Sequence, residues 1–248
     1  MDGAGGFLLL GLVGLIAGTL NTVAGGGSFL TLPVLILFGL PAGVANGTNR
    51  IGILFQNVAS VWRFDRYGVL DRRAALWAAG PATLGAALGT WAALMIPDSV
   101  FQRLLALLMV IFALLSLWAP RKPERLHKRP RHVTSVLAAS FFAAGIYAGF
   151  VQAGVGFLIL AVTSLAGLDL VRGNAVKVLA ILCATVLSLS LFAWQGRVDW
   201  ALGLSLATGQ TLGGALGARL TVLRGHAFVR AVVTVAVVVF ALRLWLTG

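Results

Sequence analysis

Ten apolar stretches, separated by short polar segments, run along the chain in two sets of five. About 20 apolar residues are enough to cross the hydrocarbon of a bilayer as a helix, and most of the stretches approach that length. The second stretch of each set is shorter, which predicts either a steep crossing or a half-helix that enters and leaves on one side. The stretches are residues 5–23, 28–40, 44–63, 74–96 and 99–119, then 133–152, 155–168, 171–194, 200–219 and 226–247.

The composition indicates that the chain faces lipid. Of its 248 residues, 59% are apolar and 10% are charged, whereas a soluble domain carries about 25% charged residues. Together with the apolar stretches, this predicts an all-α integral membrane protein. The net charge of +12 does not indicate nucleic acid as a partner, because the basic residues lie in the gaps between apolar stretches, as they do in short cytoplasmic loops.

The two sets of stretches are copies of one another. At a constant offset of 128 residues, uncommon residue types coincide without gaps. This predicts a membrane repeat at 1–119 and a second at 133–248, joined by a charged cytoplasmic linker at 120–132. The matched positions include Asn46 with Asn174, Phe64 with Phe192, Gly68 with Gly196, Asp71 with Asp199 and Thr83 with Thr211.

The distribution of Lys and Arg predicts that the repeats have opposite orientations. Residues 63–73 hold four arginines, while the corresponding segment of the second repeat holds only Arg197. Because basic residues favour the cytoplasmic side, equivalent loops are expected on opposite sides of the membrane. Residues 63–73, 120–132 and 219–230 would then be cytoplasmic, and both termini would lie outside. Inverted repeats of this kind are common among secondary transporters.

Glycine-rich interruptions stand at corresponding places in the two repeats, at residues 21–28 and 152–156. Such breaks often form the midplane substrate site of a transporter built from inverted repeats. Three consecutive glycines, Gly25 to Gly27, disfavour a continuous helix and would leave backbone N–H groups free to face a ligand. The alternative is that these glycines serve close helix packing.

Polar and cationic residues open the third stretch of each repeat. Arg50 and Lys177 are expected at a depth where an ionisable group is costly and usually functional. A cation beside a helix N-terminus would favour an anion, although either side chain could instead snorkel to an interface or pair with a backbone carbonyl. Gln56 and Gln210 are weaker candidates, because a lone amide often bonds between helices. The substrate-binding candidates are Asn21, Thr22, Gly26, Gly27, Ser28, Asn46, Asn49, Arg50, Gln152, Gly154, Asn174 and Lys177.

At these residues the chain resembles the sulfite exporter TauE/SafE family of membrane permeases. The resemblance implies transport, usually export, of sulfite, of sulfonates such as sulfoacetate, or of related organosulfur anions. It covers essentially the whole chain. It rests on residues 17–33 (AGTLNTVAGGGSFLTLP), 39–42 (GLPA) and 45–50 (ANGTNR), and in the second repeat on 149–156 (GFVQAGVG) and 167–169 (GLD).

We therefore expect a multi-pass protein of a bacterial-type inner or plasma membrane that exports a small anion by alternating access. The alternatives are a permease or channel for another anion, such as a carboxylate or thiosulfate, and a membrane subunit that transports nothing. No His-Glu-x-x-His, Gly-x-Ser-x-Gly or paired-carboxylate pattern indicates an enzyme. We expect no cofactor and no metal; the partners are the anion and the bilayer, and a homo-oligomer is left open.

Overall fold

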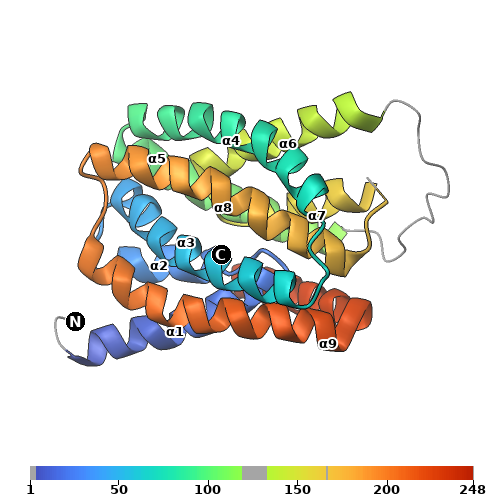
Figure 1. Ribbon diagram of the computed structural model, residues 1–248. Coiled ribbons are helices and arrows are strands. Elements are labelled where there is room, and N and C mark those ends of the chain that lie inside the picture. The colour runs from blue at the N-terminus through green and yellow to red at the C-terminus, as the bar shows by residue number, and fades with distance from the viewer. Residues whose placement is uncertain (1–3, 119–132, 166, 248) are drawn as a thin grey trace.

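The computed structural model describes residues 4–118, 133–165 and 167–247, and every regular element in these ranges is a helix (Figure 1). The predicted linker, residues 120–132, lies outside the described residues. α9 breaks at Gly225, where φ is 64°. The helices are α1 (Ala4–Val23), α2 (Ser28–Leu37), α3 (Ala42–Arg66), α4 (Arg72–Met95), α5 (Asp98–Trp118), α6 (Val133–Phe150), α7 (Val155–Leu165), α8 (Leu170–Trp194) and α9 (Trp200–Thr247).

These bounds follow the predicted apolar stretches to within a few residues. The two short stretches form α2 and α7, of 10 and 11 residues. At 1.5 Å per residue each is about half as long as the ~30 Å of hydrocarbon in a bilayer. α4, α8 and α9 each begin after an aspartate whose carboxylate accepts a hydrogen bond from a backbone N–H of the first turn, and these N-caps are Asp71, Asp169 and Asp199.

Two helix pairs, α1 with α9 and α4 with α6, form the most extensive contacts between helices. Each pair joins a helix from the first half of the chain to one from the second half. Glycines allow the close approach: a Cβ at Gly18 would overlap the backbone of Gln210, and a Cβ at Gly145 would overlap the carbonyl of Ala82. Small residues serve the same purpose in membrane helix interfaces generally.

α3 and α8 run antiparallel through the middle of the molecule. Near the end of α3, Phe64 shares a buried cluster with Ala175, at the start of α8. At the beginning of α3, the Thr48 hydroxyl accepts a hydrogen bond from the backbone N–H of Asp199, just beyond the end of α8, at 2.9 Å. The α3–α4 turn and the α8–α9 turn therefore lie at opposite ends of the bundle, as Figure 1 also shows.

The interior holds small and polar side chains together with large apolar ones such as Phe64 and Phe101, while many other large apolar side chains face outward. On α4, Ala75, Ala78 and Ala82 are buried, whereas Trp77 and Trp91 are 65% and 61% exposed. Soluble monomers rarely expose apolar surface on this scale, so the outward face of α4 suits lipid. Conversely, the buried polar set includes Asn46, Thr48, Asn49, Arg50, Gln56, Asn174, Lys177 and Gln210.

Within the described ranges, two helices are long and apolar enough to cross a membrane by length and composition alone, Gly5–Val23 and Leu170–Trp194. α3 is as long as α8, at 25 residues, but it carries amide and guanidinium side chains that are buried in the protein interior. Its polar groups therefore lower its hydropathy without facing lipid.

Candidate functional site

The chain breaks that precede α2 and α7 touch each other inside the bundle. Gly25, in the first break, has φ of 95°, and Gly154, in the second, has φ of 77°. A Cβ at Gly25 would overlap the backbone of Gly156, and a Cβ at Gly156 would overlap the Cα of Gly25. The first break thus meets the first turn of α7, directly after the second break, backbone to backbone, with no room for a side chain on either glycine.

Lys177 of α8 caps the C-terminal end of α1. Its Nζ donates to the carbonyl oxygens of Asn21 and Thr22, at 3.0 and 2.8 Å, and to Oδ1 of Asn174, at 2.6 Å. The Nδ2 of Asn174 donates to the carbonyl oxygen of Val23 at 3.0 Å. A broken helix leaves its last carbonyls without intrahelical partners, and a cation there also faces the negative end of the helix dipole.

Arg50 of α3 does the same for α6. Its Nη1 donates to the Ala148 carbonyl at 3.1 Å, and its Nη2 donates to the Gly149 carbonyl at 2.5 Å. The Nδ2 of Asn46 donates to the Phe150 carbonyl at 2.9 Å. Each half of the chain therefore supplies one cation and one asparagine to the last turn of the other half's first helix.

Both cations therefore bond backbone carbonyls, which was one of the alternatives that the sequence left open for them. They do not form a site that consists of helix N-termini alone. Ser28, at the start of α2, nevertheless lines the same pocket as Lys177, so this cation also lies near a helix N-terminus. In the described part of the chain, no carboxylate lies within ion-pair distance of Arg50 or Lys177; the ion pairs there are Arg72–Asp65, Arg172–Asp169 and Arg197–Asp98. Among the described residues, Lys177 is thus balanced by neutral oxygens, and Arg50 by neutral oxygens and by the Phe192 ring, whose centroid lies 4.8 Å from its guanidinium carbon.

A pocket lies where the breaks meet, and residues from both halves line it. Its polar wall is organised by hydrogen bonds: Nδ2 of Asn21 donates to Oε1 of Gln56 at 3.2 Å, and Nε2 of Gln152 donates to Oγ1 of Thr185 at 2.6 Å. The lining residues are Asn21, Gly25, Ser28, Ile53, Gln56, Asn57, Gln152, Val155, Gly156, Lys177 and Ile181.

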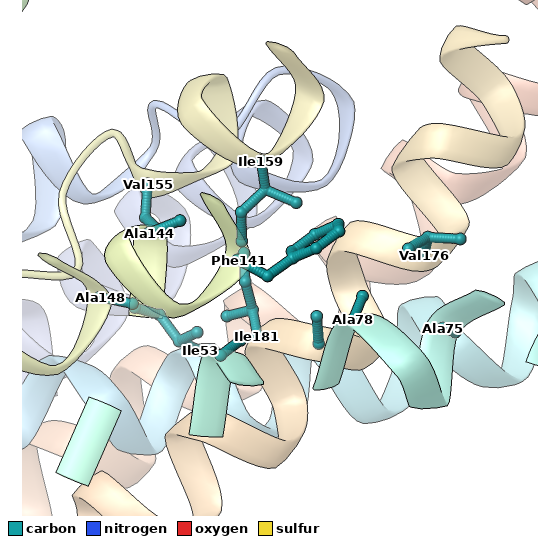
Figure 2. Close-up of a cluster of buried hydrophobic side chains, with 12 residues drawn as sticks. Ile53, Ala75, Ala78, Phe141, Ala144, Ala148, Val155, Ile159, Val176 and Ile181 are labelled. Carbon is teal, nitrogen blue, oxygen red and sulfur yellow. The ribbon is translucent and has the colours of Figure 1, made fainter. Parts of the chain in front are cut away.

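The apolar side of this pocket is continuous with a buried hydrophobic cluster. Ile53, Val155 and Ile181 belong to both, and Figure 2 shows them beside Phe141 and Ile159. This cluster packs α3, α4, α6, α7 and α8 together. The pocket therefore has a polar side and an apolar side, and the apolar side is held in place by the packing of these helices. The apolar side excludes water from one side of the polar groups.

The sequence-predicted residues divide into those that line the pocket and those that support it. Asn21, Ser28, Gln152 and Lys177 line it. The supporting residues are buried around the pocket: Thr22 pairs with Ser60 at 2.9 Å, and Asn49 accepts from Thr31 at 2.7 Å. The others in this second group are Gly26, Gly27, Asn46, Arg50, Gly154 and Asn174.

Six residues of the pocket wall were not among the candidates from the sequence, and a seventh was only a weaker candidate. Three of the six, Ile53, Val155 and Ile181, are apolar and carry no signal for a polar site. Gly25 and Gly156 belong to the glycine-rich motifs but not to the candidate set, since nothing in the sequence says which glycines touch. Asn57 carried no signal, because a lone amide in a membrane helix resembles an ordinary interhelix bond. Gln56 was a weaker candidate and lines the pocket, whereas Gln210, ranked with it, does not.

Comparison with known proteins gives matches along nearly the whole chain. A probable membrane transporter protein of Haemophilus influenzae is 28% identical over 229 residues, covering 92% of this chain and 89% of its own length. The probable membrane transporter protein YfcA of Escherichia coli is 27% identical over 241 residues, covering 96% and 90%. No solved structure shows a significant match. The family described as sulfite exporter TauE/SafE matches residues 10–244, so the chain belongs to this family of membrane transporters.

Proposed function

We propose that this protein is a secondary transporter that exports small organosulfur anions, such as sulfite or sulfonates of the sulfoacetate type. The proposal rests mainly on the pocket between the two halves. Lys177 lines this pocket and has no carboxylate partner among the described residues. A buried cation balanced only by neutral groups leaves a positive potential that favours an anion in a low-dielectric interior. The amides of Asn21, Gln56 and Gln152 add hydrogen-bonding groups suited to oxyanion oxygens.

We propose further that residues 1–119 and 133–248 are inverted repeats that rock about this pocket in alternating access. Several observations support this arrangement. α3 and α8 have bounds that differ by the same 128 residues as the sequence match, and they run antiparallel. The packing of α1 on α9 is matched by that of α4 on α6. Each half also caps the other's broken helix, so a movement of one half displaces the other half's break.

Export is the direction that the membrane potential favours for an anion. One charge gains about 2.3 kcal/mol in leaving an interior that is 100 mV negative. The described carboxylates, Asp65, Asp71, Asp98, Asp169 and Asp199, lie at or beside helix ends, and no proton relay is part of this proposal. The transport is therefore proposed to be electrogenic.

The first test is flux from liposomes that contain the purified protein and a panel of sulfite, sulfoacetate, thiosulfate and acetate. An imposed potential of 100 mV, negative on the side holding the substrate, is expected to drive a monovalent organosulfur anion to a gradient of about 50-fold. Flux should be fastest for the sulfur oxyanions. Preferential flux of acetate would reassign the substrate, potential-independent flux would remove electrogenic export, and no flux with any anion would contradict the proposal.

The orientation of the repeats is tested by labelling introduced cysteines, after Cys183 is replaced by alanine. Arg73 and Gln195 are exposed near the α3–α4 and α8–α9 turns, so Arg73→Cys and Gln195→Cys probe the two ends without altering the capping aspartates. A membrane-impermeant maleimide added to intact cells is expected to label position 195 only. Labelling of position 73 should require opened membranes. Equal labelling of both in intact cells would contradict the inverted arrangement.

A further inference from the structure

Asn57 is the one amide in the pocket wall whose polar atoms have no hydrogen-bonding partner in the described part of the chain. Its side chain is 1% exposed, and both Oδ1 and Nδ2 are unpaired. Its neighbours in the wall differ: the amides of Asn21, Gln56 and Gln152 each take part in a hydrogen bond to another side chain. Asn57 therefore lines the pocket with a side chain whose donor and acceptor are both unpaired.

Leaving such a group unpaired is unfavourable, above all in a protein interior surrounded by lipid. In the second half of the chain, the polar side chain at the corresponding position does have a hydrogen-bonding partner. At an offset of 128 residues, the position of Asn57 is taken by Thr185, whose hydroxyl accepts from Gln152 at 2.6 Å. The polar group of Thr185, in the second half, thus has a partner within the protein. The amide of Asn57, in the first half, has none among the described residues and is available to a ligand.

We propose that Asn57 selects the substrate by pairing with both an oxygen acceptor and a hydrogen-bond donor on it. This rests on the proposed function and narrows it to singly charged sulfur oxyanions that carry an O–H or N–H group, such as hydrogensulfite or a hydroxyalkanesulfonate, so that the doubly charged sulfoacetate is disfavoured. An amide offers an NH2 donor and a carbonyl acceptor. A fully deprotonated oxyanion carries acceptors only, so it would leave the Asn57 carbonyl unpaired and facing a negative charge. Lys177, in the same wall, supplies the balance for one negative charge.

The test compares 2-hydroxyethanesulfonate with ethanesulfonate, which have the same charge and nearly the same size but differ in one hydroxyl. Sites that bond a substrate hydroxyl reject the analogue that lacks it much more strongly than apolar pockets reject a small change in size. Wild-type liposomes are expected to prefer the hydroxyl-bearing anion by about tenfold or more, as loss of one buried hydrogen bond predicts. Asn57→Leu, which keeps the approximate volume, should transport both anions with a preference near unity.

Gln210→Leu is the matched control. Gln210 is also a fully buried amide with both polar atoms unpaired, but it lies outside the pocket wall, so its replacement should keep the wild-type preference. Equal wild-type flux of the two anions would overturn the inference about Asn57. A preference for the hydroxyl-bearing anion that persists in Asn57→Leu would overturn it too. Neither result would contradict the proposed transport of organosulfur anions. Wild-type flux of neither anion alongside sulfite flux would likewise overturn only the inference, and the absence of flux with every sulfur anion would remove both. The wild-type comparison stands even if the leucine variant does not fold.

Discussion

Replacing Lys177 with methionine is expected to lower organosulfur anion flux by about 100-fold or more. A unit charge and an anion about 5 Å apart attract by about 3 kcal/mol at an effective dielectric constant near 20, which corresponds to about two orders of magnitude in affinity. Methionine keeps most of the length of the side chain but removes the charge. It also leaves the carbonyls of Asn21 and Thr22, at the end of α1, without their capping donor.

The measurement is initial flux from liposomes, with thermal unfolding of the same preparation in detergent. Arg172→Gln provides the control on the same helix, because the Arg172 side chain is 65% exposed and its ion pair with Asp169 is 3.6 Å long. Exposed pairs contribute at most about 1 kcal/mol, so this variant should be close to wild type. Lys177→Arg, which retains the charge, should recover part of the flux. Wild-type flux in Lys177→Met would exclude the cation from the site.

An alanine at Gly25 is expected to destabilise the protein by about 2–5 kcal/mol and to abolish transport. The new Cβ would enter the backbone of Gly156, and overpacking alone typically costs about 1–3 kcal/mol. The left-handed backbone at Gly25, with φ of 95°, adds about 1–2 kcal/mol for any residue with a Cβ. Because the overlap is with backbone on both sides, no side-chain rotation can relieve it.

Gly39→Ala separates these two causes. Gly39 has nearly the same backbone conformation, with φ of 92°, but no atom of a neighbouring element lies within 4 Å of the place that a Cβ would take. Its replacement should therefore cost only the conformational part, about 1–2 kcal/mol, and should leave transport measurable. Thermal unfolding in detergent and sulfite flux are the two readouts. If the two variants were equally stable and equally active, the contact between the two breaks would have no role in folding or transport.

The positions of the helices could be predicted from the sequence because the periodic polar gaps mark their ends. The half-length of α2 and α7 also followed from the spacing of the gaps. The break at Gly225 divides α9 into two helices, and it lies between the stretches at 200–219 and 226–247 that the sequence separated. The charged linker stays a prediction, since it lies outside the described residues.

The place of the pocket could be predicted from the sequence, but the hydrogen bonds around it could not. Asn21, Ser28, Gln152 and Lys177 line this pocket, and the glycine-rich breaks at matching places had pointed to them; their role in binding a substrate stays a prediction. The partners of Arg50 could not be found in this way, because carbonyl oxygens exist at every residue and the sequence does not say which ones a fold leaves free. Asn57 was missed for the opposite reason: it is singled out by having no hydrogen-bonding partner among the described residues, which only three-dimensional packing reveals.

The pairing of α1 with α9 also bears on how the protein is made. The Thr19 hydroxyl bonds the carbonyl of Gly213, a contact that spans 194 residues of sequence. Synthesis proceeds at roughly 5–20 residues per second. The contacting part of α9 is therefore made about 10 to 40 s after that of α1. During that interval the glycine-bearing face of α1 is occupied by lipid or by the insertion machinery. The contact between α1 and α9 can therefore form only after α2 to α8 have been synthesised.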